Sequence, residues 1–221
     1  MITEKERGYF ITFEGIEGSG KSTVARKVLE SFVQAGLECI ITREPGGNMI
    51  SEKIREMLLD PGNKSISPRT ELLLYVASRA QLVGEVIGPA LENGTSVLCD
   101  RFLDASVAYQ GWARGIGEDV VAGLYTFAVA GAVPDRTYLL DLEVGDGFER
   151  GPDRREAEGQ RDRDRLELEK RDFHEKVREG YLRIASREPE RVSVIDASRP
   201  LDEVIEAVIG NLKALPGLKC L

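Results

Sequence analysis

One short segment of the chain carries residue types that suit the binding and transfer of phosphate. Residues 15–22 read GIEGSGKS and match the pattern G-x-x-x-x-G-K-[S/T]. Glycines let backbone N–H groups surround an anion, and the N-terminus of a following helix adds partial positive charge. We expect Lys21 to reach the β- and γ-phosphates of ATP and the Ser22 hydroxyl to hold Mg²⁺. The predicted ATP-binding residues are Gly15, Ile16, Glu17, Gly18, Ser19, Gly20, Lys21, Ser22 and Thr23.

Two features around this segment favour phosphate binding over an ordinary glycine-rich turn. An apolar run at 9–13 precedes it and a helical pattern follows it, which is the strand–loop–helix context that the motif requires. A second apolar run, 97–99, ends at Asp100, which we expect to hold Mg²⁺ or its water. A regulatory GTPase would also carry Asn-Lys-x-Asp after a strand, but the Asn-Lys pair at 63–64 is followed by Ser-Ile. The sequence therefore excludes that class.

Arginines recur beyond this segment, near the ends of predicted strands and on predicted helices. A guanidinium is always charged and forks around phosphate oxygens, so it suits a second phosphate group. Taken singly, each arginine would be a surface salt-bridge partner. Taken together after a phosphate-binding loop, they predict a nucleoside monophosphate as the acceptor. The four are Arg43, Arg55, Arg79 and Arg101.

These residues need elements that bring them to one place, and the hydrophobic pattern predicts such elements. Short runs rich in β-branched, aromatic and leucine residues lie at 9–13, 38–42, 96–99, 137–142 and 192–195. Helical patterns lie between them, including apolar stripes over 24–33 and 72–83. The alternation of strands and helices predicts a three-layer α/β domain with a mostly parallel sheet.

Composition and charge narrow the class of protein further. The chain has 221 residues, of which 42% are hydrophobic, so we expect one domain over residues 1–221. Its 30 Lys and Arg against 38 Asp and Glu give a net charge of −8, which excludes a protein that coats nucleic acid. Three widely spaced cysteines fit neither a disulfide framework nor a zinc site. No apolar run approaches the roughly 20 residues of a membrane span, so we expect a cytoplasmic protein without a membrane partner.

The segment 149–179 departs from this pattern. Roughly two-thirds of it is charged with both signs interleaved, and its early part contains glycine and proline. By itself it predicts a solvated loop that runs into a surface helix from about Arg165. Beside a phosphate-binding loop, its arginines also suit a lid that closes over ATP and excludes water.

Several short motifs occur in order along nearly the whole chain. They are FEG leading into the phosphate-binding loop at 13–15, REPGG at 43–47, ELLLYVASRAQ at 71–81, DRF at 100–102, AYQG at 108–111, DRLE at 164–167, FH at 173–174 and GYL at 180–182. With this set the chain resembles the thymidylate kinase family. The resemblance implies a P-loop nucleoside monophosphate kinase-like three-layer sandwich, with a five-stranded parallel sheet flanked by helices and a mobile arginine-rich lid at about 147–166. It also implies transfer of the γ-phosphoryl group of Mg-ATP to the 5′-phosphate of dTMP, giving dTDP and ADP in dTTP biosynthesis.

The resemblance implies a role for each residue on the acceptor side. At the acceptor phosphate it places Arg101 and Arg55, and Arg43 and Glu44 line the same site. On the base it implies stacking by an aromatic ring, a contact at O4, a hydrogen-bonding pair and a ring against C2′ of the sugar. These four roles fall on Tyr75, on Arg79, on Ser106 with Gln110, and on Tyr109. The family commonly has Phe at the position of Tyr75, which leaves fine substrate preference open.

The resemblance further implies that an arginine outside the phosphate-binding loop completes the catalytic set. Some thymidylate kinases carry an arginine within the loop, but here that position is Gly18, so the lid must supply the charge. The hypothesis names Arg161 or Arg165, which act with Lys21 and Arg101. Glu17 occupies the family's acidic position in the loop, beside the acceptor sugar or phosphate, although a solvated loop glutamate is an alternative.

Three further expectations follow from this resemblance and its alternatives. The family implies a homodimer, with helices from Arg69 and Asp104 at the interface. A related enzyme class, acting on dUMP or on deoxynucleosides, would carry many of the same residues. A P-loop regulator that binds nucleotide without phosphorylating an acceptor is the alternative outside enzymes, but it would not need a second phosphate site.

Overall fold

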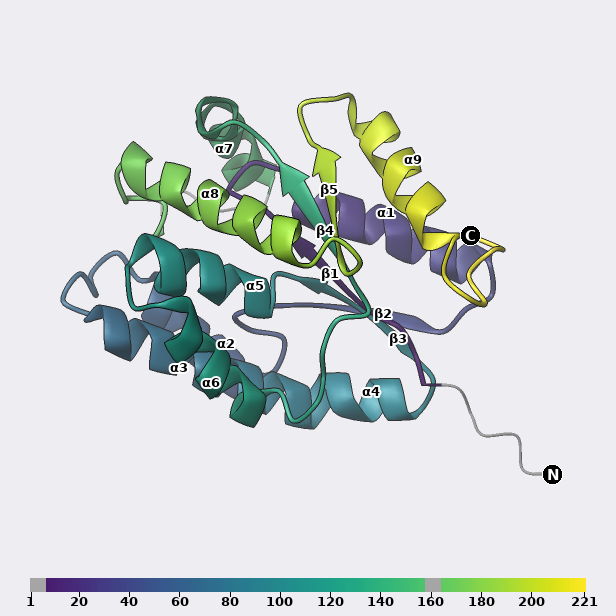
Figure 1. The fold of residues 1–221 in the computed structure, drawn as a ribbon, viewed down its shortest axis with the longest axis horizontal. Helices are drawn as coiled ribbons and strands as arrows, with labels where there is room; N and C mark the ends of the chain where they lie inside the picture. Colours follow the sequence, from purple (N-terminus) through teal and green to yellow (C-terminus); the bar gives the residue numbers. More distant parts are fainter. Residues whose placement is uncertain (1–6, 158–163) are drawn as a thin grey trace.

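The structure is a computed structural model that describes residues 7–157 and 164–221, with side chains described outside 151–163. Its centre is one five-stranded sheet in which all paired strands are parallel and the order is β2-β3-β1-β4-β5 (Figure 1). The strands are β1 (Phe10–Glu14), β2 (Cys39–Arg43), β3 (Ser96–Asp100), β4 (Arg136–Asp141) and β5 (Val192–Asp196). All five predicted strands are confirmed to within a residue or two at each end.

Helices connect the strands and cover both faces of the sheet. They are α1 (Lys21–Gln34), α2 (Met49–Leu59), α3 (Pro68–Leu82), α4 (Gly88–Glu92), α5 (Leu103–Ser106), α6 (Glu118–Ala128), α7 (Val144–Ala157), α8 (Arg171–Arg187) and α9 (Leu201–Leu212). Two π-helical segments, Val83–Ile87 and Val107–Ala113, continue α3 and α5. In the described ranges, no helix combines the length and apolar character needed to cross a bilayer.

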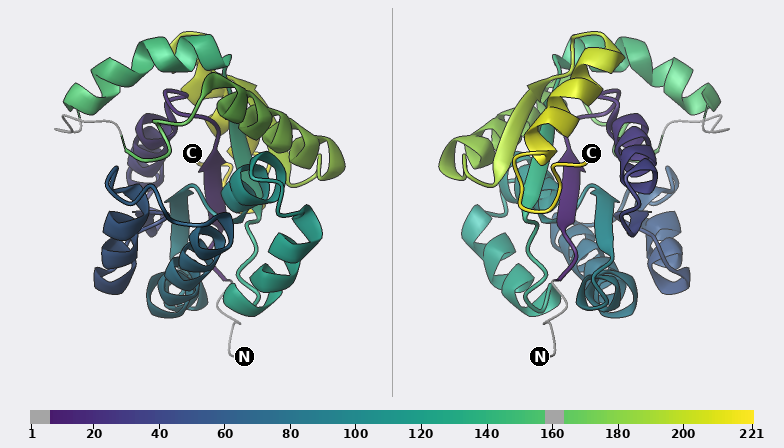
Figure 2. Two further views of the ribbon diagram at one scale, coloured as in Figure 1. Left: turned by 90° about the vertical axis from the view of Figure 1, so that its left-hand side faces the viewer. Right: turned by 90° about the vertical axis from the view of Figure 1, so that its right-hand side faces the viewer.

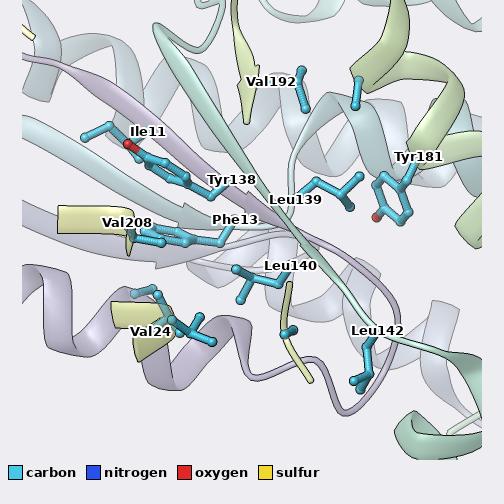
Figure 3. Packing of buried hydrophobic residues seen from close by; sticks show 14 of the residues in the cluster. Ile11, Phe13, Val24, Tyr138, Leu139, Leu140, Leu142, Tyr181, Val192 and Val208 are labelled. Atoms are coloured by element: carbon cyan, nitrogen blue, oxygen red, sulfur yellow. The ribbon is translucent and has the colours of Figure 1, made fainter. Parts of the chain in front are cut away.

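Side chains that alternate along the strands build a core on each face of the sheet. Phe13 of β1 points toward Val24 of α1 and Val208 of α9 (Figure 3). Phe10 belongs instead to a second cluster, with residues of α3, α4 and α6. Together with α8, which contacts β4 and β5, these helices complete the predicted three-layer α/β sandwich.

Two residues of the predicted apolar stripes are not part of this core. Val33 is 64% exposed and Leu73 is 55% exposed. Each directly follows a buried residue, Phe32 or Leu72, and a step of one residue turns a side chain by about 100° around a helix. The stripes are therefore narrower than the sequence pattern predicted.

The strand register brings the carboxyl ends of β1, β2 and β3 together. Phe13 pairs with Asp100 and with Tyr138, and Arg43 also pairs with Asp100. The residues that follow these strands therefore lie at the carboxyl edge of the sheet, where ligands bind in open parallel sheets.

The charged segment differs from the sequence-based expectation of a loop. Helix α7 covers Val144–Ala157, and the next helix begins at Arg171 rather than near Arg165. Val144 is buried, and a Cβ on Gly147 would lie 2.6 Å from the Glu17 carbonyl oxygen. Packing against the phosphate-binding loop thus overrides the glycine and proline content of this segment. Figure 2 shows α7 extending outward from the top of the sheet.

Candidate active site

The phosphate-binding loop (residues 15–22) joins β1 to α1 along a path that requires glycine. Gly15 and Gly18 have φ angles of 139° and 75°, in the region that other residues rarely adopt. A Cβ on Gly15 would lie 2.5 Å from the Leu140 carbonyl oxygen, and one on Gly18 would lie 2.5 Å from that of Gly147. The loop therefore ends at the N-terminus of α1, where unpaired backbone N–H groups favour an anion.

Lys21 is buried inside this loop. Its Nζ donates to the Ile16 carbonyl oxygen at 2.7 Å and to Ser19 Oγ at 3.3 Å. Burial, with the Arg101 guanidinium nearby, lowers the pKa of Lys21 to about 8. The ammonium is thus held among loop oxygens, and a phosphate in the loop would stabilise its charge. The Thr23 N–H closes the first turn of α1 with a hydrogen bond to Gly20.

Ser22, in the first turn of α1, meets Asp100 at the end of β3. The Ser22 hydroxyl donates a short hydrogen bond to Asp100 Oδ2. A hydroxyl and a carboxylate are oxygen ligands of the kind that Mg²⁺ takes when phosphates and waters complete its shell. In the described part of the chain, three or more His, Cys, Asp or Glu side chains do not gather into a metal cage. The donor set thus fits an Mg²⁺ that arrives with a nucleotide.

Arg101 links the phosphate-binding loop to the acceptor side. Its φ of 67° is unusual for a non-glycine residue, and it directly follows β3. Its Nη1 donates to the Gly15 carbonyl oxygen at 2.9 Å and to the Tyr181 hydroxyl at 3.1 Å. Its Nη2 lies 3.8 Å from Glu17 Oε2, and the guanidinium lies over the Tyr109 ring at 5.3 Å. Three predicted site residues and Tyr181 therefore surround the Arg101 charge.

Glu14, at the end of β1, is a site residue that the sequence reasoning did not select. It is fully buried and accepts hydrogen bonds from the Phe102 N–H at 2.7 Å and the Tyr181 hydroxyl at 2.8 Å. Burial, with a contribution from Asp104, raises the pKa of Glu14 to about 7. An acid at the end of an otherwise apolar strand was the available signal.

A second polar group, formed by Arg191, Asp104 and Thr137, lies near Glu14, whose pKa the Asp104 charge helps to raise. Arg191 donates through Nη1 and Nη2 to both oxygens of Asp104, each at 2.8 Å, and through Nη1 to Thr137 at 2.7 Å. Thr137 in turn lies 2.7 Å from Thr12 Oγ1. The pair fixes the start of α5 against β1 and β4. Its partners are 87 residues apart, so sequence spacing gave no signal for it.

Two arginines predicted for the acceptor phosphate lie at the end of β2 and on α2. Arg43 donates to both oxygens of Glu52 at 3.1 Å, and Arg55 donates to the Pro45 carbonyl oxygen at 2.9 Å. Burial and repulsion from Arg43 lower the pKa of Arg55. Two guanidinium groups that repel each other favour an anion between them.

The base end of the site, defined by Glu44, Arg79, Ser106, Gln110 and Glu71, is built from buried side chains. Glu44 lies 2.6 Å from Arg79 Nη2 and accepts from its Nε at 2.7 Å, and both side chains are 1% exposed. Arg79 also donates to Ser106 Oγ at 3.1 Å. Gln110 donates to Glu71 at 2.8 Å. The predicted hydrogen-bonding residues for the base thus fall into two buried groups, one around the Glu44–Arg79 ion pair and one in which Gln110 donates to Glu71.

Two aromatic rings complete the predicted acceptor site. Tyr75 is 8% exposed, and burial with the nearby Glu71 charge raises its pKa. Tyr109 is 6% exposed, and burial raises its pKa to about 12 despite the Arg101 charge. Its ring meets those of Phe173 and Tyr181 edge to face at 6.0 and 6.3 Å. Both phenols are therefore neutral over the physiological range.

The structure places the predicted lid arginines differently from one another. Arg165 is buried: its Nε donates to the Leu58 carbonyl oxygen at 2.8 Å, and its Nη2 lies 2.6 Å from Glu71. It therefore belongs to the base end in this arrangement, not beside the phosphate-binding loop. Arg150 of α7 donates to the Ala197 carbonyl oxygen after β5 at 2.9 Å. Arg161 lies outside the described residues.

Comparison with known proteins relates this arrangement to one family. The thymidylate kinase family profile matches residues 13–208. The thymidylate kinase of Pelobacter propionicus is 52% identical over 206 residues, which are 93% of this chain and 94% of that protein. The thymidylate kinase of Desulfosudis oleivorans is 49% identical over 210 residues, which are 95% of this chain and 98% of that protein. The crystal structure of thymidylate kinase from Ehrlichia chaffeensis superposes with a TM-score of 0.73 at 29% identity, over 94% of this chain and 99% of that one.

Proposed function

The chain belongs to the thymidylate kinase family, and from that premise we propose how its residues divide the phosphorylation of dTMP among them. The enzyme is a phosphotransferase that moves the γ-phosphoryl group of ATP to the 5′-phosphate of dTMP and releases dTDP and ADP, a step in dTTP biosynthesis. The observation that best supports this division of roles is the position of Arg101, whose guanidinium contacts both the phosphate-binding loop and the ring of Tyr109.

The donor end of the reaction falls to the phosphate-binding loop. Loop N–H groups and Lys21 bind the phosphates of ATP, and Lys21 neutralises charge that develops on the β- and γ-oxygens. Ser22 and Asp100 would hold Mg²⁺, which supplies further neutralisation of phosphate charge when it is bound.

The acceptor end needs no strong base, because a phosphate oxygen of dTMP is already ionised near neutral pH. Arg43 and Arg55 bind the acceptor phosphate, and Arg101 orients it toward ATP. Glu17 keeps Arg101 in position through their ion pair. Catalysis then consists of in-line positioning and neutralisation of spread charge. Arg161 remains the predicted lid arginine, since Arg165 is engaged with Glu71.

The buried side chains of the base end recognise the base. Tyr75 stacks on thymine, and Arg79 donates to its O4 while Glu44 holds the guanidinium in place. Ser106 and Gln110 supply the remaining polar contacts, and Tyr109 packs against the sugar. Such a pocket rejects other bases because they would leave its buried polar groups unpaired.

A panel of acceptors tests this assignment. ATP consumption is followed by coupled ADP detection with dTMP, dUMP, dCMP, dGMP and thymidine, and products are identified by ion-exchange chromatography. We expect dTMP to have the highest kcat/KM and dTDP to be the product. Another best acceptor would indicate a related nucleotide kinase, and ATP binding without any phosphorylated acceptor would indicate a regulator.

We further propose a homodimer and a cytoplasmic location. Exposed apolar side chains lie on α3 and α6, with Leu73 55%, Val120 53% and Phe127 88% exposed. The segment from Asp104, which the sequence reasoning put at the interface, is largely buried against α8, so α6 replaces it in the proposal. Light scattering after gel filtration tests this: wild type should have twice the mass of Phe127→Glu.

A further inference from the structure

Glu71 of α3 is a buried carboxylate surrounded by donors, and no step above gives it a task. It is 1% exposed. Its Oε1 accepts from Gln110 Nε2 at 2.8 Å, and its Oε2 lies 3.2 Å from Arg114 Nη2 and 2.6 Å from Arg165 Nη2. Burial alone would raise the pKa of Glu71, but the Gln110 hydrogen bond and the two arginines outweigh it and lower the pKa. The group is therefore ionised at neutral pH and only accepts hydrogen bonds.

An acceptor-only neighbour fixes the orientation of the Gln110 amide. A primary amide donates through Nε2 and accepts through Oε1, and rotation by 180° exchanges the two. Turning Oε1 toward the Glu71 carboxylate would set two acceptors against each other in a buried site. Among the described residues, the hydrogen bonds of the Gln110 side chain consist of the one to Glu71. Its Oε1 is thus directed away from Glu71 as an acceptor for another group.

We propose that Glu71 is the positioning residue that sets the polarity with which the site reads the acceptor base. The proposal rests on the proposed function, because it takes Gln110 as a base contact. With Oε1 presented to the base, Gln110 accepts the N3–H of a 2,4-dioxopyrimidine. Cytosine has a lone pair at N3, so the same orientation opposes two acceptors and leaves both unpaired.

This reading separates two kinds of selectivity. Thymine and uracil both carry N3–H, so Glu71 does not help the enzyme to tell dTMP from dUMP. Thymine and cytosine differ at N3, so Glu71 does help it to tell dTMP from dCMP. A merely structural role for Glu71 would affect the three acceptors alike, which makes the pair of ratios diagnostic.

The decisive variant is Glu71→Gln, which keeps the size of the side chain but offers both a donor and an acceptor. Gln110 then turns either way, so the ratio of kcat/KM for dTMP to that for dCMP should fall at least about tenfold. The dTMP to dUMP ratio should stay within twofold of wild type. Glu175→Gln is the matched control, since Glu175 pairs with Arg171 on the exposed side of α8 and both ratios should stay unchanged.

A second variant keeps the test decisive if Glu71→Gln does not fold, as judged by circular dichroism. Glu71→Asp is still acceptor-only, so its kcat/KM falls with dTMP but its dTMP to dCMP ratio should stay near that of wild type. The inference is overturned if Glu71→Gln leaves that ratio within twofold, if both ratios fall together, or if Glu71→Asp loses the ratio. A wild-type enzyme that does not prefer dTMP would instead contradict the proposed function.

Discussion

In the phosphate-binding loop (residues 15–22) the main chain supplies most of the binding groups, and glycines set its path. At the base end, Arg79 and Gln110 are held by the buried carboxylates of Glu44 and Glu71. The first site is shaped by backbone angles, with a φ of 139° at Gly15. The second is shaped by ion pairs between side chains that are far apart in sequence.

The difference has a functional meaning. Backbone N–H groups at a helix N-terminus bind any phosphate and do not depend on which base it carries. Fixed side-chain donors and acceptors bind only a base with the matching pattern, because a mismatch leaves buried groups unpaired. On the proposed assignment, the enzyme places general anion binding and selective base recognition at opposite ends of one site. Substitutions at the two ends should therefore separate activity from stability.

The largest effect is expected for Lys21→Met at the phosphate end. Loss of a charge aimed at the transferring phosphoryl group should lower kcat/KM on the order of 10³-fold. The free energy of unfolding should not fall by more than about 1 kcal/mol, because burial already disfavours this ammonium in the folded state. Steady-state kinetics and urea unfolding measure the two quantities. Lys27→Met on the exposed face of α1 is the control and should change neither quantity. A large loss of stability in Lys21→Met would contradict the separation of activity from stability at the two ends of the site.

The next largest effect is expected for Glu44→Gln at the base end. It leaves Arg79 buried with its charge uncompensated, so the free energy of unfolding should fall by about 3 kcal/mol. Activity with dTMP should fall as well, because the guanidinium loses its support. Glu30→Gln removes an exposed carboxylate paired with Lys27 and should cost less than about 1 kcal/mol. Equal stability losses in the two variants would show that burial does not distinguish these ion pairs.

The same division explains what could be predicted from the sequence. Strands such as Phe10–Glu14 are buried along their whole length, so the apolar runs identified them. The phosphate-binding loop was predictable because a local pattern determines its backbone. The hydrophobic pattern does not define the width of the buried face of a helix, so Val33 and Leu73 were wrongly placed in the core.

The base end was only partly predictable, for a physical reason. The base-contact roles of Tyr75, Arg79 and Gln110 came from the family resemblance, but the carboxylates that hold Arg79 and Gln110 lie elsewhere in the chain. Glu71 and Gln110 are 39 residues apart, and no local pattern links them. Helix α7 was missed because contacts of Gly147 with the loop, not helix propensity, hold it in place. Long-range pairing is what a single sequence does not encode in its spacing.

A smaller effect sharpens the account of the phosphate end. The pKa of Lys21 is about 8 in the free enzyme, below its ordinary value of 10.5, so roughly three-quarters of these side chains are neutral at pH 8.5. On the proposed assignment, ATP binds the ammonium form of Lys21 and therefore raises this pKa again. Binding at pH 8.5 should therefore take up roughly 0.7 proton, and affinity should fall as pH rises above 8. Calorimetry in buffers of different ionisation enthalpy measures the uptake. Lys21→Arg should show none, and uptake that is absent in wild type at pH 8.5 would contradict the low pKa.

Only a small change in stability is expected for Arg43→Gln, which tests whether burial or pairing governs the difference between ion pairs. Arg43 and Glu52 are 55% and 37% exposed, whereas Arg79 and Glu44 are each 1% exposed. Solvent screens the first pair, so its loss should cost less than about 1 kcal/mol, against about 3 kcal/mol for Glu44→Gln. The same substitution should raise KM for dTMP about tenfold through a lost charged contact, with KM for ATP unchanged. If instead KM for ATP rises equally, Arg43 does not belong to the acceptor phosphate, and the boundary between the two ends of the site must move.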